Sequence, residues 1–322
     1  MLSVLRKQSG ISRRRQRRLF DLSFGKTWGK ASVGRLKEEV RRADDMGMRP
    51  NAFAKAGDSN LGAYNSLYGL GCREPLWGDH AGLEPVVRRY REVELPPGEG
   101  PPPHVHPSAD RQPWNSFSRS SAATHSGCLA AHVLAPASEF QGLPGWVADP
   151  DCPPEDSMLE FEIRTLKPRY VFVMFGTNGS SFGFTSLETA EQSAGIVEAV
   201  RRLGPVPVFC TIPPQLDRDE LQGRWEFARD TSRHMAELAR DLGAPLFDQW
   251  TALTSGKLIN DGMIEFQGGF FDGFHLETQG GTLAPEALQQ SVDFRPEALV
   301  YGNNLRNLLM LQVLEALDSS LV

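Results

Sequence analysis

The chain has 322 residues, of which 40% are hydrophobic and 23% charged, figures typical of a globular protein that can bury a large core. Its net charge of −6 is unevenly distributed, because residues 1–30 hold nine Lys and Arg against one acidic residue, and the remainder is acidic. No stretch approaches the ~18 consecutive apolar residues of a membrane-spanning helix, and the acidic body argues against a nucleic-acid partner.

The basic start contains SRRRQRRLF at 12–20, a pattern found in nucleic-acid arms, polybasic membrane anchors and export signals. The ten residues that follow do not supply the apolar stretch of roughly 7–15 residues that an export signal needs. Short blocks of like charge are as a rule solvated. We therefore predict that residues 1–31 form a disordered leader, or a truncated or misassigned start, and the cellular location stays open.

The first predicted elements are a helix at 32–47 and a short strand at 51–57. The helix places Val33, Leu36, Val40 and Ala43 on one face and ends at Gly47. About 110 residues of weak periodicity follow. Within them, 96–113 holds seven of the 23 prolines, which excludes regular structure. We interpret it as a Pro-rich insertion in one domain that covers residues 32–322.

From residue 168 the pattern becomes regular. The continuous apolar run at 168–175 is typical of a strand that is buried on both faces. After it we predict, in chain order, a helix, a strand, a long helix, a short strand and a C-terminal helix, at 185–204, 206–212, 217–243, 244–250 and 303–317. This alternation predicts a parallel sheet with helices on both faces, a three-layer α/β/α sandwich.

Three polar clusters follow predicted strands or lie near the C-terminus: Gly57 to Asn60, Gly176 to Gly179, and Asp272 to His275. In parallel sheets, functional groups collect at the carboxyl ends of the strands. A Gly-Asp-Ser triplet alone arises by chance in roughly one chain in ten of this length. The three clusters therefore carry weight only together and in this order.

Together they resemble the SGNH, or GDSL-type, hydrolase superfamily. Residues 52–60 match its first block, 170–179 its third and 270–277 its last, and the resemblance extends over about 33–318. It implies a flavodoxin-like fold and a serine esterase that hydrolyses carboxylic esters through an acyl-serine intermediate, without metal or cofactor. The resemblance leaves the substrate open between an acetylated carbohydrate and a short-chain lipid ester.

The resemblance assigns Ser59 as nucleophile, His275 as its base and Asp272 as the group that fixes the imidazole tautomer. A serine hydroxyl needs such a base, and imidazole is suited to this near neutral pH. Three donors are implied for the oxyanion: the Ser59 backbone N–H, the Asn178 amide and a backbone N–H from a second block at 115–127. The usual glycine of that block aligns loosely with Ala122, and the nearest glycine is Gly127.

Several features keep alternatives open. Arg119 in the second block either orients a substrate or pins the loop. His104 and His106 form an H-x-H without a third ligand at useful spacing, so we expect no metal. Cys72, Cys128 and Cys152 could include one disulfide in an exported protein, whereas Cys210 is expected to be a core thiol. The competing function is a catalytically silent binding module that retains the fold, and the oligomeric state is open.

Overall fold

The computed structural model describes residues 14, 17, 20–21, 24, 30–62, 66–96, 114–140, 151–217, 222–255, 264–267, 270–278 and 286–320. Most of the predicted leader and of the Pro-rich insertion, with His104 and His106, lies outside these residues, so the predicted domain limits stay a prediction. Within the described ranges, no helix is both long and apolar enough to cross a membrane.

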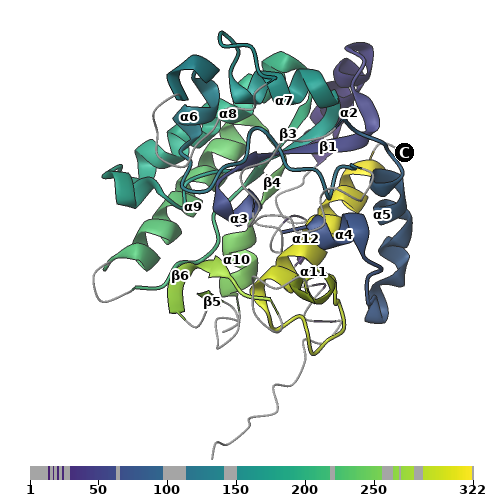
Figure 1. Ribbon diagram of the computed structural model, residues 1–322, viewed down its shortest axis with the longest axis vertical. Helices are drawn as coiled ribbons and strands as arrows, with labels where there is room; N and C mark the ends of the chain where they lie inside the picture. Colours follow the sequence, from purple (N-terminus) through teal and green to yellow (C-terminus); the bar gives the residue numbers. More distant parts are fainter. Residues whose placement is uncertain are drawn as a thin grey trace, which may run out of the picture.

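The centre of the molecule is a parallel sheet of four strands in the order β1-β2-β3-β4 (Figure 1). The strands are β1 (Arg49–Gly57), β2 (Pro168–Met174), β3 (Val206–Cys210) and β4 (Leu246–Phe247). Every residue of β2 and β3 is buried, as expected for parallel strands covered on both faces. The predicted parallel sheet is confirmed, and the carboxyl ends of its strands share one edge of the sheet.

Helices cover both faces of this sheet and give the predicted three-layer sandwich (Figure 1). One layer consists of α6 (Ala130–Leu134), α7 (Met158–Leu166), α8 (Ser186–Leu203) and α9 (Arg224–Leu242). The other consists of α2 (Lys30–Asp45), α5 (Glu84–Arg91), α10 (Gln249–Thr254) and α12 (Gly302–Ser319). Shorter elements are α3 (Ser59–Gly62), α4 (Tyr68–Cys72), α11 (Glu286–Gln290), η2 (Gly78–Leu83), η4 (Ala137–Phe140) and η5 (Gly179–Phe182).

The local signals for helix ends agree with the structure where they are strong. Thr185 and Glu188 form the predicted capping box of α8, and Gly204 ends that helix with φ +117°. The predicted helix at 217–243 begins only at Arg224. Two helices of the weakly periodic region, α5 and α7, were not predicted, although the Ser157-x-x-Glu160 capping box of α7 was a usable signal.

His275 lies outside the main sheet. It belongs to β6 (Phe270–Leu276), which pairs antiparallel with β5 (Ile264–Gln267) in a separate two-stranded sheet. Gly273 has φ +81°, a backbone conformation that favours glycine, two residues before His275. The position of this histidine therefore depends on how the β5–β6 hairpin contacts the rest of the domain.

A lysine is buried in β1, close to the start of α3. Lys55 is 2% exposed, its Nζ donates to the Phe117 carbonyl at 3.0 Å, and the Tyr68 ring centroid lies 3.7 Å from Nζ. Burial lowers the pKa of Lys55 to about 7, and the negative charge of Glu162 opposes this shift in part. A group of this kind makes stability depend on pH.

Replacing Lys55 with methionine is expected to stabilise the fold more at pH 7 and below than near pH 10. The folded pKa of about 7 lies below the value of roughly 10.4 in an unfolded chain. Between these values only the unfolded state holds the proton, so this group makes wild-type stability rise with pH, by at most ~1.4 kcal/mol per pH unit. Below pH 7 the lysine is charged in the folded and in the unfolded state. The folded wild type then bears the full free-energy cost of burying a charged side chain, which Lys55→Met removes.

Urea unfolding of the wild type and Lys55→Met at about pH 6, 8 and 9.5 measures this difference. Lys37→Met, at an exposed position of α2, is the matched control and should show no pH-dependent difference. A difference between wild type and Lys55→Met that stays constant over this range would contradict the prediction.

Candidate active site

The structure brings together two residues that are 216 positions apart in the sequence. His275 Nε2 lies 2.8 Å from Ser59 Oγ, a hydrogen-bonding distance. Ser59 is the first residue of α3, immediately after β1, and both side chains are half-buried. With Nε2 unprotonated, the imidazole accepts the hydroxyl proton, which is the arrangement that activates a serine as a nucleophile.

Asp58 shapes the turn that presents Ser59. Its carboxylate accepts from the Asn60 N–H at 3.0 Å and from the Thr177 N–H at 3.2 Å. The side chain is fully buried, and burial raises its pKa against the opposing effect of these hydrogen bonds. Asp58 therefore joins the loop after β1 to the loop after β2, so that the Ser59 turn and the Asn178 loop have a common support.

Glycine is required at the end of β1, because a Cβ on Gly57 would lie 2.7 Å from the Met174 carbonyl oxygen. Arg306 of α12 contacts the turn after Gly57, because its Nη1 donates to the Asn60 carbonyl at 2.5 Å. Burial lowers the pKa of this guanidinium, and the charge of Asp58 opposes the shift. Arg306 and Asp58 both contact the backbone of Asn60. Sequence reasoning missed Arg306, which carries no local motif.

Asn178 lies in the loop after β2, and its side chain reaches Cys128, the residue directly after the second block. Its Nδ2 donates to the Cys128 carbonyl at 3.2 Å. Asn60, in the Ser59 turn, donates to the Thr177 hydroxyl and to the Phe274 carbonyl, both at 3.2 Å. The loops that carry the nucleophile, the amide and the base therefore meet at one edge of the sheet.

The second block lies beside the end of β1. Gly57 donates its N–H to the Ala123 carbonyl at 2.9 Å and accepts from the His125 N–H at 3.1 Å. The Ala122 N–H, one of the two predicted donors, already donates to Glu162 Oε2 at 3.2 Å in the interior. Gly127 is half-buried with φ +73°, and among the described residues no hydrogen bond engages its N–H. Of the two N–H groups, the one of Ala122 is therefore engaged in the interior, and the assignment of the third oxyanion donor stays a prediction.

Arg119 lies in the interior. Its Nη1 is 2.6 Å from Glu162, both side chains are 2% exposed, and it also donates to the Pro96 carbonyl at 3.0 Å. The guanidinium therefore pins the second-block loop to α7 and offers almost no surface to a substrate. This geometry supports the loop-pinning interpretation of Arg119.

The remaining expectations from the sequence concern Asp272, the four cysteines and a metal site. Asp272 is in β6, but its side chain is outside the part of the chain that the structure describes, so its role stays a prediction. Cys72, Cys128, Cys152 and Cys210 are all free thiols. Among the described residues, no three His, Cys, Asp or Glu side chains gather as a group that could hold a metal ion.

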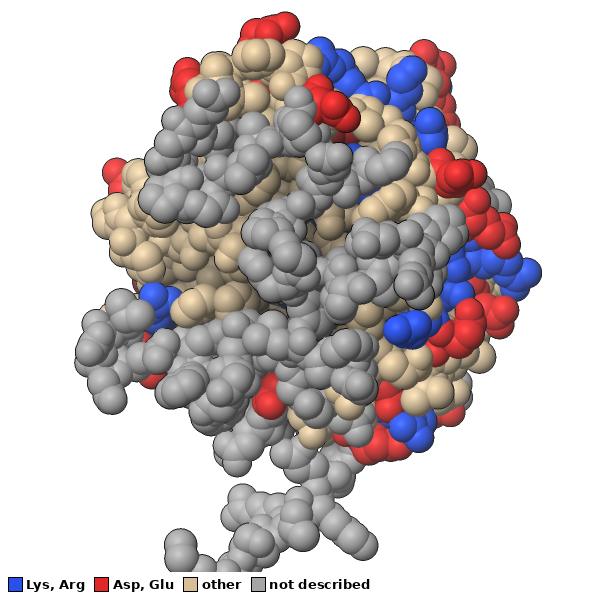
Figure 2. Space-filling model, viewed as in Figure 1, with Lys and Arg blue, Asp and Glu red and all other residues tan. Residues whose placement is uncertain are grey.

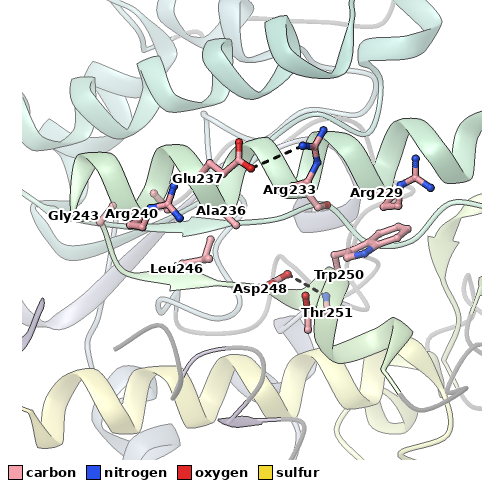
Figure 3. Close-up of a pocket in the computed structure, with 13 residues that line it drawn as sticks. Arg229, Arg233, Ala236, Glu237, Arg240, Gly243, Leu246, Asp248, Trp250 and Thr251 are labelled. Atoms are coloured by element: carbon pink, nitrogen blue, oxygen red, sulfur yellow. Dashed lines mark hydrogen bonds and ion pairs between the residues drawn. The ribbon is translucent and has the colours of Figure 1, made fainter. Parts of the chain in front are cut away.

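A cavity of about 630 Å³ lies between α9 and α10 and is also lined by Leu246 of β4 (Figure 3). Arg233, Glu237 and Arg240 line it from α9, and Trp250 and Thr251 line it from α10. Its lining includes none of the candidate catalytic residues. On the face shown in Figure 2, basic and acidic side chains of the described residues are interspersed and not gathered by sign.

Several solved structures align with this chain at low sequence identity. The native aryl esterase of M. smegmatis aligns at 15% identity with a TM-score of 0.40, over 83% of this chain and 99% of that one. A carbohydrate esterase family 3 protein from Talaromyces cellulolyticus aligns at 13% identity with a TM-score of 0.45, over 82% and 98%. A GDSL-like lipase from Bacteroides thetaiotaomicron aligns at 13% identity with a TM-score of 0.40, over 60% of this chain and 74% of that one. No curated protein sequence matches the chain.

A family model gives the stronger finding. Residues 114–283 match the GDSL-like lipase/acylhydrolase family. The matched range contains Asn178 and His275 and begins after Ser59, so it bears out the resemblance seen in the sequence without depending on the serine. Because the match extends over more than half of its length, the chain belongs to the GDSL-like lipase/acylhydrolase family, and hydrolysis of carboxylic esters is the class of reaction that this membership indicates.

Proposed function

We propose that this protein is a serine esterase that uses Ser59 as nucleophile and His275 as general base. The observation that supports it most directly is the 2.8 Å separation of Ser59 Oγ, at the start of α3 after strand β1 of the main sheet, and His275 Nε2, in β6 of the separate sheet. A base within hydrogen-bonding reach of a half-exposed serine is the geometry that acyl transfer needs. In this mechanism Asp272 would hold the imidazole in the tautomer that leaves Nε2 free to accept a proton.

In the acylation step, Ser59 Oγ attacks the carbonyl carbon of the ester while His275 Nε2 takes the hydroxyl proton. The negative charge that develops on the carbonyl oxygen is received by the Ser59 N–H, the Asn178 amide and the Gly127 N–H. Donors placed in this way contribute about 10²–10³ in rate each. His275 then gives its proton to the alcohol oxygen as the ester C–O bond breaks, which leaves an acyl-serine.

In the deacylation step, His275 takes a proton from water, and the water oxygen attacks the acyl carbon. The same donors receive the second oxyanion, and the proton returns to Ser59 Oγ as the carboxylic acid leaves. No metal or cofactor takes part in this mechanism. The substrate is a small acyl ester, and we retain two classes for the test, an acetylated carbohydrate and a short-chain lipid ester.

A fluorophosphonate probe tests the proposal because it reacts with activated serines whatever the natural substrate. Wild-type protein should be labelled, and Ser59→Ala should not. Ser138→Ala, at an exposed position of η4, is the matched control and should be labelled like the wild type. Absence of labelling in folded wild-type protein would indicate the silent binding module, and labelling of Ser59→Ala would indicate another nucleophile.

The substrate class is tested with p-nitrophenyl esters of increasing chain length and an acetylated polysaccharide. A preference for acetyl over octanoyl esters, with release of acetate from the polysaccharide, would support the carbohydrate ester. The opposite preference, without acetate release, would support the lipid ester.

A further inference from the structure

The β5–β6 hairpin, which carries the proposed base, is connected to the rest of the domain by individual hydrogen bonds from side chains and from the backbone. Asn60 of α3 donates to the Phe274 carbonyl at 3.2 Å, and Asn303 of α12 donates to the Leu276 carbonyl. These carbonyls flank His275. Because no ladder of the main sheet holds β6, these individual contacts determine where His275 lies relative to Ser59.

The segment after β3 reaches both halves of the site. The Gln215 side chain donates to the Thr177 carbonyl at 3.1 Å, directly before Asn178. The next residue, Leu216, donates its N–H to the Gly273 carbonyl at 2.7 Å, two residues before His275. This segment therefore connects the loop of the oxyanion donor to the strand of the base.

Arg224, the first residue of α9, makes a second connection between the same two elements. Its Nη2 donates to Ser181 Oγ at 3.2 Å, on the turn η5 that follows Asn178. Its guanidinium carbon lies 5.1 Å from the centroid of the Phe274 ring, next to His275. The side chain is 6% exposed, and Asp217 Oδ1 accepts from the Arg224 N–H at 2.8 Å.

We propose that Arg224 is a positioning residue that holds the His275 strand against the Asn178 loop, so that base and oxyanion donor keep a common orientation toward Ser59. The inference rests on the proposed esterase function and deepens it. Arginine suits this place because a planar guanidinium can lie against an aromatic ring and donate a hydrogen bond at the same time. A lysine ammonium has no plane with which to cover the ring.

The first test is kinetic, with p-nitrophenyl acetate as substrate. Arg224→Met should lower kcat by on the order of 10- to 100-fold, the cost of a small misplacement of reacting groups, while KM stays within about 2-fold. Arg224→Lys retains the charge and should still lower kcat. Arg233→Met, at an exposed position of the same helix, is the matched control and should leave both constants unchanged.

The second test does not depend on turnover. Amide hydrogen exchange of β6 should become faster in Arg224→Met, while exchange in β1 and β2 stays at the wild-type rate. Unchanged exchange in β6, or faster exchange with unchanged kcat, would overturn the inference. A raised KM at constant kcat would also overturn it, because it would place Arg224 against the substrate.

These outcomes are distinct from a failure of the proposed function. If the wild type hydrolyses no ester and is not labelled at Ser59, the esterase proposal fails, and faster exchange in β6 alone then supports the positioning of the strand. If the wild type is active and Arg224→Met behaves like Arg233→Met in both measurements, the esterase proposal stands and the role of Arg224 is overturned.

Discussion

Replacement of His275 by glutamine is expected to lower kcat for p-nitrophenyl acetate by about 10⁴- to 10⁶-fold, and Ser59→Ala should cost about as much. Glutamine keeps a polar side chain of moderate size but cannot take the proton from Ser59 Oγ, which lies 2.8 Å from the imidazole. Because the two residues act as one unit, Ser59→Ala/His275→Gln should lose little more activity than either single variant. Steady-state kinetics of the three variants measure this.

His234→Gln, a partly buried histidine of α9 beside Glu237, is the matched control for loss of an imidazole. It should retain kcat, and all variants should unfold near the wild-type temperature. Losses that add in the double variant would contradict the shared role of Ser59 and His275. A His275→Gln variant within about tenfold of the wild type would show that another group takes the proton.

The strands and the polar residues that follow them were predictable because their signals are local. The apolar run of β2 and the capping box of α8 each lie within a few residues of the element that they define. Ser59 and Asn178 lie within four residues of the ends of β1 and β2. A parallel sheet brings the carboxyl ends of its strands to one edge, so their proximity could be inferred without coordinates.

The sequence pointed to a structural role as one of two alternatives for Arg119, but neither its partner nor Arg306 was predictable, because the contacts are made far away in the sequence. Arg306 contacts Asn60 across 246 positions, and Arg119 pairs with Glu162 across 43. Each is an arginine within a segment that gives no sign of a buried partner. Burial of such a group follows only from the packing of several elements, which sequence periodicity does not encode.

In the second block, too, a contact with a distant residue could not be predicted from the sequence. Comparison with the family pattern gave Gly127 as a candidate with Ala122 as the alternative, because each has a backbone N–H. The structure separates them through Glu162 on α7, which accepts the Ala122 N–H. Helix α7, which carries Glu162, was not predicted from the sequence. The contact that engages the Ala122 N–H could therefore not be foreseen.

Breaking the Arg119–Glu162 pair is expected to cause the largest loss of stability outside the core. Arg119→Met should lower the free energy of unfolding by about 3–5 kcal/mol, because it leaves a carboxylate in the interior without its ion-pair partner. Both side chains are 2% exposed, so water cannot replace the guanidinium without opening the loop. Urea unfolding near neutral pH measures the change.

The double variant Arg119→Met/Glu162→Gln should recover at least half of that loss. The glutamine side-chain oxygen can still accept the Ala122 N–H, which the Glu162 carboxylate accepts at 3.2 Å, and neither member of the pair then carries a charge. The exposed pair Arg233 and Glu237, at 3.9 Å, is the matched control, and its double variant should change stability by less than about 1 kcal/mol. Additive losses in the Arg119 and Glu162 variants would mean that the two side chains stabilise the loop independently. Recovery would mean that the pair acts as one connection between α7 and the loop that carries Gly127.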